Sequence, residues 1–391
     1  MLVRQYALSL VIMSILLVPA ITLTAVSQEE KTTIGGYGNA VYTREMQSGA
    51  AGIDLERMVI FIGHAFTPKV SLVSELEMED AKVEGGAGGG EIAFEQAYVQ
   101  FALDAGHRVV AGLFLPRVGL LNENHLPTQF NGNERTQVET YIIPSTWREL
   151  GVGFYGGNDV LPFEYSIALV NGLNASGFEH GSVIREGRFE GRNASAAALA
   201  LTGSVAKSVG GARFQVSGYY GGAAGLPPGE ADSLSIRGGA FGTPVALGEA
   251  DAQLSAGRLS LRLLGTIVSI PDAGSINEAF HNNTPQSAYG AYAEAAYEIL
   301  PQGETPAGST ATAFVRYERL NMNAKIPANG VSDGTLDQRH LVAGVGYSPV
   351  QDVVVKTDVR FQWTGAPSTG SGAAAGDRET TYFTLGIGFA Y

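Results

Sequence analysis

The stretch that decides the fold is Glu379–Tyr391, which reads ETTYFTLGIGFAY. Its large apolar and aromatic side chains recur at every second position: Phe383, Leu385, Ile387, Phe389 and Tyr391. Alternation with a period of two, with mostly small or polar residues between, is typical of a β-strand with one apolar face. A soluble sandwich would bury that face in a core, whereas a barrel in a lipid bilayer would turn it outward. The aromatic last residue favours the closing strand of such a barrel, with Tyr391 at the membrane interface.

The N-terminus predicts a secretory signal peptide over residues 1–27, followed by a mature chain over residues 28–391. Arg4 precedes an apolar run at 7–23, and small residues follow before the polar segment, as in secretory signals. A membrane anchor is the alternative, but Pro19 interrupts the apolar run. No later segment reaches the roughly 18 apolar residues that a spanning helix needs. The mature chain is therefore expected to have no transmembrane helix.

Composition narrows the function classes further. The chain has no cysteine, which excludes disulfides, thiolate metal sites and a lipid-anchored N-terminal cysteine. Its formal net charge is −13, and loss of the signal peptide removes one further positive charge. Such an acidic chain is not expected to bind nucleic acid. Moderate hydropathy without a helical span fits a barrel, in which only every second strand residue meets lipid.

Sixteen segments carry strand patterns, and the connections between them alternate in length. The strands are expected near 33–43, 53–65, 69–80, 91–103, 107–115, 147–156, 161–171, 196–206, 211–221, 244–255, 258–269, 287–299, 309–319, 338–348, 352–363 and 379–391. Connections after odd-numbered strands are mostly long, and those after even-numbered strands are mostly tight turns, as in barrels with long outer loops and short periplasmic turns. The sequence therefore predicts an all-β fold: a transmembrane antiparallel β-barrel of about 16 strands, in contact with outer-membrane lipid.

One face of the predicted strands is charged, which indicates a water-filled interior. In the segment 69–80, Glu75, Glu77 and Glu79 alternate with apolar residues. Three alternating acids could form a metal or cation site, but such residues more often line a wet wall and pair with neighbouring arginines. The histidines are dispersed and lack the His-x-x-x-His spacing of zinc sites. We therefore expect no metal site and no cofactor.

The segment Pro116–Trp147 is too long for an ordinary loop. It combines apolar residues such as Leu120 and Ile142 with many polar ones. Apolar anchors in a wet loop suggest that it packs against the inner wall as an inward-folded third external loop and narrows a channel. A loop folded over the outer rim is the alternative. The polar residues expected at the constriction are Asn122, Glu123, His125, Asn131 and Arg135.

The basic residues of the lumen face are candidates for an anion path. Turns of two or three residues place Arg213 opposite Ala206, Arg258 opposite Ser255, Arg262 opposite Asp251, Lys356 opposite Gly344 and Arg360 opposite His340. Arg262 is thus expected to be neutralised by its cross-strand acid, and the other four to carry free positive charge. Guanidinium groups bind phosphate and carboxylate bidentately, so this wall predicts a weak preference for small inorganic or organic anions.

Three stretches resemble the phosphate-selective porin O and P family. They are VIFIGHAFTPKVSLVSELEMEDA (59–81), GEIAFEQAYVQF through PSTWRELGVGF (90–154) and GLNASGFEHGSVIREGRFEGRNASA (172–196). The resemblance is densest over 52–205 and implies a sixteen-stranded homotrimeric porin with an inward third loop and an arginine-lined path for anions such as phosphate. The best-studied members also use lysine clusters, whereas the lysines of this chain do not cluster.

Taken together, the sequence predicts an outer-membrane porin of a Gram-negative bacterium, a water-filled channel for passive diffusion of small hydrophilic solutes, and no enzyme. The alternatives are an outer-membrane barrel hydrolase and a plugged structural or adhesive surface barrel. A hydrolase needs a nucleophile, a base and an orienting group that converge. His180 and Ser182 are neighbours, but the chain has no Gly-x-Ser-x-Gly elbow. The charged wall argues against a plugged barrel. A measurement of single-channel conductance would distinguish a plugged barrel from a porin.

Overall fold

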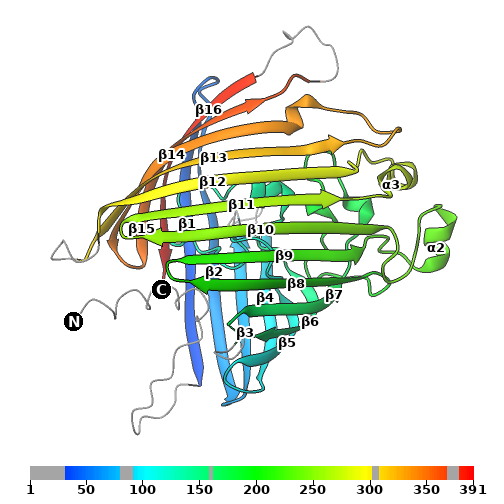
Figure 1. Cartoon of the computed structure of the whole chain (residues 1–391), viewed down its shortest axis with the longest axis horizontal. Coiled ribbons are helices and arrows are strands. Elements are labelled where there is room, and N and C mark those ends of the chain that lie inside the picture. The colour runs from blue at the N-terminus through cyan, green and yellow to red at the C-terminus, as the bar shows by residue number, and fades with distance from the viewer. Residues whose placement is uncertain (1–30, 80–90, 158–161, 302–307, 368–377) are drawn as a thin grey trace.

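The computed structural model describes residues 31–79, 91–157, 162–301, 308–367 and 378–391, so the predicted signal peptide at 1–27 lies outside the described residues. Sixteen antiparallel strands close into a single barrel, because β1 pairs with both β2 and β16 (Figure 1). The strands are β1 (Thr32–Glu45), β2 (Ala51–Thr67), β3 (Val70–Glu79), β4 (Glu91–Ala102), β5 (His107–Phe114), β6 (Glu149–Gly156), β7 (Glu164–Asn171), β8 (Leu199–Val209), β9 (Ala212–Gly222), β10 (Pro244–Ala256), β11 (Leu259–Ser269), β12 (Ser287–Leu300), β13 (Thr310–Lys325), β14 (Asp337–Val350), β15 (Val353–Thr364) and β16 (Arg378–Ala390). The predicted fold class and strand count are confirmed.

The helical segments are short and belong to the connections between strands. They are η1 (Val138–Ile142), η2 (Ala175–Gly177), η3 (Arg185–Gly187), α2 (Pro228–Ser233), α3 (Ala273–Phe280) and η4 (Gly334–Leu336). Helices α2 and α3 lie at the same end of the barrel (Figure 1). Within the described part of the chain, no helix is long and apolar enough to cross a membrane.

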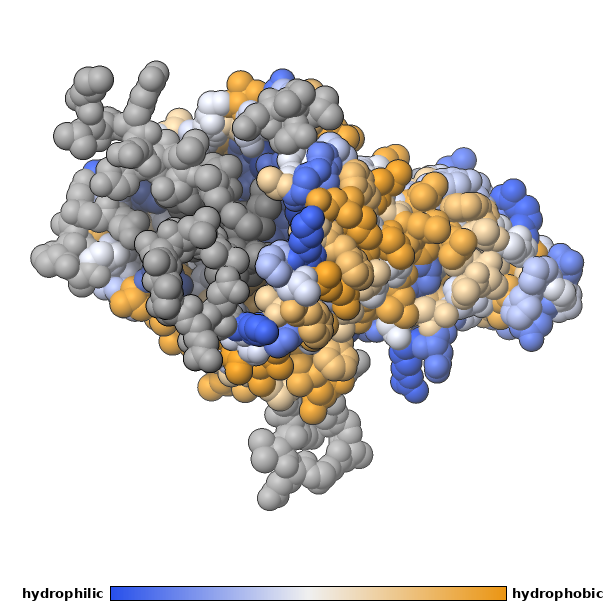
Figure 2. All heavy atoms as spheres, turned by 90° about the horizontal axis from the view of Figure 1, so that it is seen from below, coloured by the Kyte–Doolittle hydropathy of each residue, from blue (hydrophilic) through white to orange (hydrophobic). Residues whose placement is uncertain are grey.

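The strands alternate between an apolar outer face and a polar inner face. In β16, Leu385 and Ile387 are exposed while Thr384, Gly386 and Gly388 between them are buried, as the period of two requires. Apolar residues cover a broad part of the outer surface in Figure 2. Exposed large apolar side chains on other strands include Ile53, Ile92, Val152, Ile167, Val216, Ile267 and Val315. An apolar surface this extensive marks an interaction face rather than a water-facing one.

The register of three hairpins differs from the prediction by two residues, which leaves the side chains that stay in the strands on their predicted faces. Arg213 lies opposite Ser208, Arg262 opposite Gln253, Lys356 opposite Gly346 and Arg360 opposite Val342. The cause in two of the hairpins is glycine: Gly210 and Gly257, with φ of 59° and 60°, take the first central position of the turn. Hairpin turns favour a left-handed residue at that position. Arg258 consequently belongs to the turn before β11 and does not face Ser255.

Two β-bulges reverse the face pattern within a strand. The pairing of β1 with β2 skips Glu56, and the pairing of β3 with β4 skips Glu95. A bulge places one extra residue in a strand, so the residues before and after it change faces. The exposed side chains of β4 accordingly shift from Ile92 and Phe94 to Phe101. Both bulges direct acidic side chains towards the lumen.

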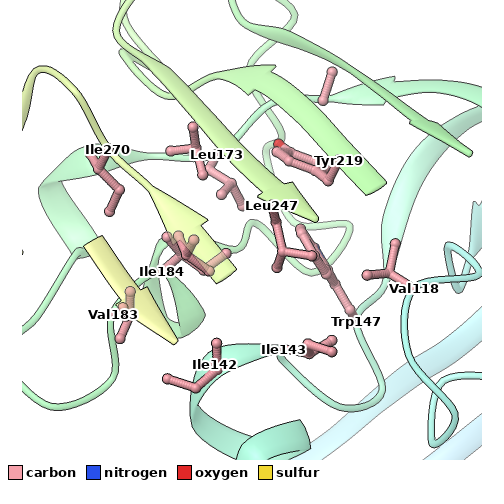
Figure 3. Close-up of a cluster of buried hydrophobic side chains, with 14 of the residues drawn as sticks. Val118, Ile142, Ile143, Trp147, Leu173, Val183, Ile184, Tyr219, Leu247 and Ile270 are labelled. Carbon is pink, nitrogen blue, oxygen red and sulfur yellow. The ribbon is translucent and has the colours of Figure 1, made fainter. Parts of the chain in front are cut away.

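An apolar core lies inside the barrel, between the loops and the inner wall. The β5–β6 loop (residues 115–148) and the connection between β7 and β8 pack together against the inner faces of β9–β11 (Figure 3). Trp147 is fully buried at the centre, with its ring 4.7 Å from that of Tyr219. Val118, Ile143 and Leu247 surround it. Burial of these side chains, roughly 1.5–3 kcal/mol each, holds the loop inside the barrel.

Candidate functional site

The β5–β6 loop is attached to the inner wall by hydrogen bonds to residues of several strands. Lys356 donates from Nζ to the carbonyls of Phe130 and Gly132 at 2.7 and 2.8 Å. The other wall contacts are Arg262 to Gln129 O, Arg316 to Asn131 O, Tyr292 to Glu139, and Asn133 to Asp358 and Thr384. Burial raises the pKa of Glu139, and the Tyr292 hydroxyl donates to its carboxylate at 2.8 Å. Charged wall residues thus satisfy backbone groups of a loop that water reaches poorly.

Glycines on the inner face of the wall make room for this loop. A Cβ atom on Gly388 would lie 2.8 Å from Cβ of Pro127, and one on Gly290 would lie 2.8 Å from Cγ1 of Val138. A Cβ atom on Gly386 would overlap Oδ1 of Asn133. The small residues in the even positions of the last strand therefore serve the loop packed against them.

Substitution of Gly386 by alanine is expected to destabilise the folded protein by about 1–3 kcal/mol, because the new methyl group overlaps Asn133 in a packed seam. The matched control is Gly248→Ala on the outer face of β10, where an added Cβ meets no atom within 4 Å. That change is expected to stay within about 0.5 kcal/mol. Urea unfolding of the refolded protein in detergent measures both values, and equal values for the two variants would contradict the packing described here.

A water-accessible cavity of about 380 Å³ lies between the β5–β6 loop and β1–β3. The wall supplies Asn39, Asp54, Glu56, Arg57 and Glu79 to its lining, and the loops supply His125, Pro127, Phe130, Asn133, Glu134, Arg135, Gln137, Thr140, Ser145 and Arg185. The loop is packed on β9–β16, and the cavity lies on its other side, against β1–β3. This cavity is the candidate functional site.

Charges of both signs line the cavity, and most of them are paired. Arg57 lies 3.3 Å from both Glu77 and Glu79. Arg360 pairs with Glu134 at 3.1 Å. Two of the three alternating acids of β3 therefore pair with arginine, as the wall interpretation predicted. The charges of the paired side chains largely cancel. Any ion selectivity of the cavity therefore depends on the charged side chains that lack such a partner.

Arg135 is the cavity cation that is held by hydroxyl groups instead of a carboxylate. Its Nη1 donates to Ser145 Oγ at 3.4 Å and to Thr146 Oγ1 at 3.3 Å. Burial lowers the pKa of Arg135 to about 10, which still leaves the guanidinium charged at neutral pH. Arg185, from the connection after β7, donates to Thr140 O at 3.0 Å on the same side of the cavity.

The five predicted constriction residues divide into two groups. His125 and Arg135 line the cavity. Asn122 closes the loop on itself through Val118 O, Pro144 O and the Trp147 amide. Glu123 pairs with Arg117 and Arg213, and Asn131 donates to Glu294, so both face the wall.

The predicted anion-path residues do not line this cavity. Arg213 pairs with Glu123 at 2.9 Å, and Arg262 and Lys356 hold loop carbonyls. Arg360 reaches the site only through Glu134, and Arg258 is in an exposed turn. Arg213, Lys356 and Arg360, expected to be free, are partnered by loop groups, because the wall face that they occupy is covered by the loop.

The sequence interpretation missed Asn39, Asp54 and Arg57 as lining residues. Strict alternation would place Arg57 on the outer face with Ile53 and Leu55, and the bulge at Glu56 returns it to the lumen. A charge on an otherwise apolar face was the signal that could have revealed the bulge. The candidate hydrolase pair is not assembled, because Nε2 of His180 and Oγ of Ser182 are both buried without a hydrogen-bond partner.

Comparison with known proteins relates this geometry to other barrels. No family model matches the chain, so membership of the phosphate-selective porin O and P family stays a prediction. An uncharacterized protein of Aquifex aeolicus (strain VF5) is 28% identical over 344 residues, which are 83% of this chain and 74% of that protein.

Solved structures with similar folds include three outer-membrane channels. The channel DcaP of Acinetobacter baumannii superposes with a TM-score of 0.59 at 10% identity, over 94% of this chain and all of that one. OmpF of Salmonella typhi in complex with daunomycin gives 0.57 at 10% identity over 92% of this chain and 97% of that one. An anion-selective porin from Comamonas acidovorans gives 0.54 at 13% identity over 92% of this chain and 99% of that one. At these identities the similarity shows the barrel fold.

Proposed function

We propose that this protein is an outer-membrane porin, a water-filled channel for passive diffusion of small hydrophilic solutes in a Gram-negative bacterium. The observation that carries the proposal is the charged cavity of about 380 Å³ inside a closed barrel with an apolar outer surface. An apolar exterior with a polar lumen suits a barrel that spans lipid. The homotrimer implied by the family resemblance belongs to the same proposal, and chemical crosslinking in detergent tests it.

The proposed channel has a weak preference for anions such as phosphate. Asp54 is exposed, so solvent and salt screen its charge, whereas Arg135 is half-buried at the loop surface and screened less. Selectivity follows the charges at the narrow part of a pore rather than the net charge of the chain. Arg57, Glu79 and Glu134 contribute little because each is paired. Arg185 lies 3.7 Å from Glu186, and the lining acid Glu56 accepts a hydrogen bond from Asn39. The positive charge left to Arg135 is therefore small, and so is the expected preference.

Insertion into a planar bilayer tests the function directly, with stepwise conductance as the expected result. Arg135→Gln should then move the reversal potential in a potassium chloride gradient towards cation preference, because it removes the least screened cation of the cavity. Arg237→Gln is the matched control, since Arg237 is 66% exposed on the β9–β10 loop and pairs with Asp272 outside the cavity. Equal shifts in the two variants would show that Arg135 does not set selectivity, and a folded barrel without conductance would refute the porin function.

A further inference from the structure

Three potential metal ligands from distant parts of the chain meet where the β5–β6 loop contacts β3 and β4. They are Glu75 of β3, Glu95 at the bulge of β4 and His125 of the loop, with one ligand atom of each within 4.8 Å of the others. Nε2 of His125 lies 3.4 Å from Oε1 of Glu95 and 3.8 Å from Oε2 of Glu75. The β4 bulge creates this arrangement, because it turns Glu95 inward beside Gln96.

The polar atoms at the centre of this cluster make no hydrogen bond. The side chains of Glu95 and His125 are 0% and 7% exposed. Oε1 of Glu95 and Nε2 of His125 are both buried without a hydrogen bond. Each buried polar atom without a hydrogen bond destabilises the fold by roughly 1–3 kcal/mol. A ligand bound between these two atoms would remove that penalty from both.

The remaining contacts hold the two carboxylates in position. The Tyr37 hydroxyl donates to Oε2 of Glu95 at 2.6 Å, and Gln96 Nε2 donates to Oε2 of Glu75 at 2.8 Å. Hydrogen-bonded carboxylates of this kind are typical of metal sites, where they fix the orientation of the ligand atoms. The cluster is therefore an ordered arrangement and not a group of loose surface acids.

We propose that Glu75, Glu95 and His125 bind a divalent transition-metal ion of the Zn²⁺ type. Zinc bonds of about 2.0–2.2 Å to nitrogen and oxygen in a tetrahedron place neighbouring ligand atoms about 3.4 Å apart. The two separations from His125, 3.4 and 3.8 Å, are close to this value, and the ligand atoms of Glu75 and Glu95 lie within 4.8 Å of each other. One imidazole with two carboxylates suits Zn²⁺ better than Mg²⁺ or Ca²⁺, which prefer all-oxygen sites. His125 lines the cavity, so the ion enters from the lumen and water completes its coordination.

The bound ion would connect the loop to the wall on the side opposite its core. The loop packs mainly on β9–β16, and its end is held to β3 by Arg148, which pairs with Glu77 at 3.1 Å. Its contact with β3 and β4 also contains Oε1 of Glu95 and Nε2 of His125, which make no hydrogen bond. A bridging ion would stabilise the closed position of the loop. It would also add positive charge beside Arg135, which strengthens anion preference and narrows the path.

Calorimetric titration of the refolded full chain in detergent with zinc chloride tests the site without reference to conductance. We expect one Zn²⁺ per chain and a higher unfolding temperature with Zn²⁺, and no effect of Mg²⁺. His125→Ala and Glu95→Gln should abolish both responses. Tyr37→Phe, which removes only the hydrogen bond to Glu95, should weaken binding about 10- to 100-fold.

His180→Ala is the matched control, because this loop histidine is outside the cluster and should leave Zn²⁺ binding unchanged. Absence of binding to the wild type, or binding that survives both His125→Ala and Glu95→Gln, would overturn the proposal. The effect on selectivity rests on the proposed porin function, whereas the binding does not. A protein that binds Zn²⁺ but does not conduct would refute the porin function and leave the metal site in place.

Discussion

Removal of residues 122–140 from the β5–β6 loop, with a short Gly-Ser link between Leu121 and Tyr141, is expected to raise single-channel conductance severalfold. The loop occupies the lumen in front of β9–β16, so its removal opens that part of the cross-section to water. The barrel itself is closed by strand pairing that does not involve the loop. Conductance in planar bilayers measures the effect.

The control for this deletion is a chain without α2 (Pro228–Ser233), which lies in the β9–β10 connection and does not line the cavity. Its conductance should match that of the wild type. Lys356→Met provides a milder test, because it removes the hydrogen bonds to Phe130 O and Gly132 O and keeps the loop sequence. Unchanged conductance in the deletion variant, with the barrel still folded and inserted, would show that the loop does not limit the channel.

Trp147→Ala is expected to lower the free energy of unfolding by about 3–5 kcal/mol, the usual cost of removing a fully buried tryptophan. The indole is in contact with Tyr219 and donates from Nε1 to Glu149 at 2.7 Å. Its loss leaves both a cavity and a buried carboxylate with one donor fewer. Denaturant unfolding of the refolded barrel in detergent, followed by β-type circular dichroism, measures the loss.

Trp363→Ala serves as the comparison, since the other tryptophan of the chain is half-buried and stacks on Phe361 of the same strand. Trp363→Ala should lower the free energy of unfolding clearly less than Trp147→Ala does. Equal losses of unfolding free energy would mean that the core inside the barrel contributes no more to stability than the outer surface does. A larger conductance of Trp147→Ala than of Trp363→Ala would further link this core to the position of the loop.

The sequence alone determined the strands and, away from the two bulges, their faces. A period of two is a local property of the chain, so Leu385 and Ile387 could be assigned to one face without knowledge of any partner strand. The hairpin registers were wrong by two residues, yet the faces were right, because a shift of two preserves the alternation. The exact turn depended on which residue takes the left-handed conformation, and Gly210 and Gly257 decided it.

Only the tertiary structure decided which charged residues meet the channel. The bulges at Glu56 and Glu95 depend on pairing with neighbouring strands, and they bring Arg57 and Glu95 to the lumen. The contact between Lys356 and Phe130 joins residues 226 positions apart. Whether a basic wall residue is open to solutes or covered by the loop depends on such distant contacts, which form only when the barrel closes. The alternating strand pattern therefore determined the barrel. The packing of the β5–β6 loop against β9–β16 determined which residues line the cavity.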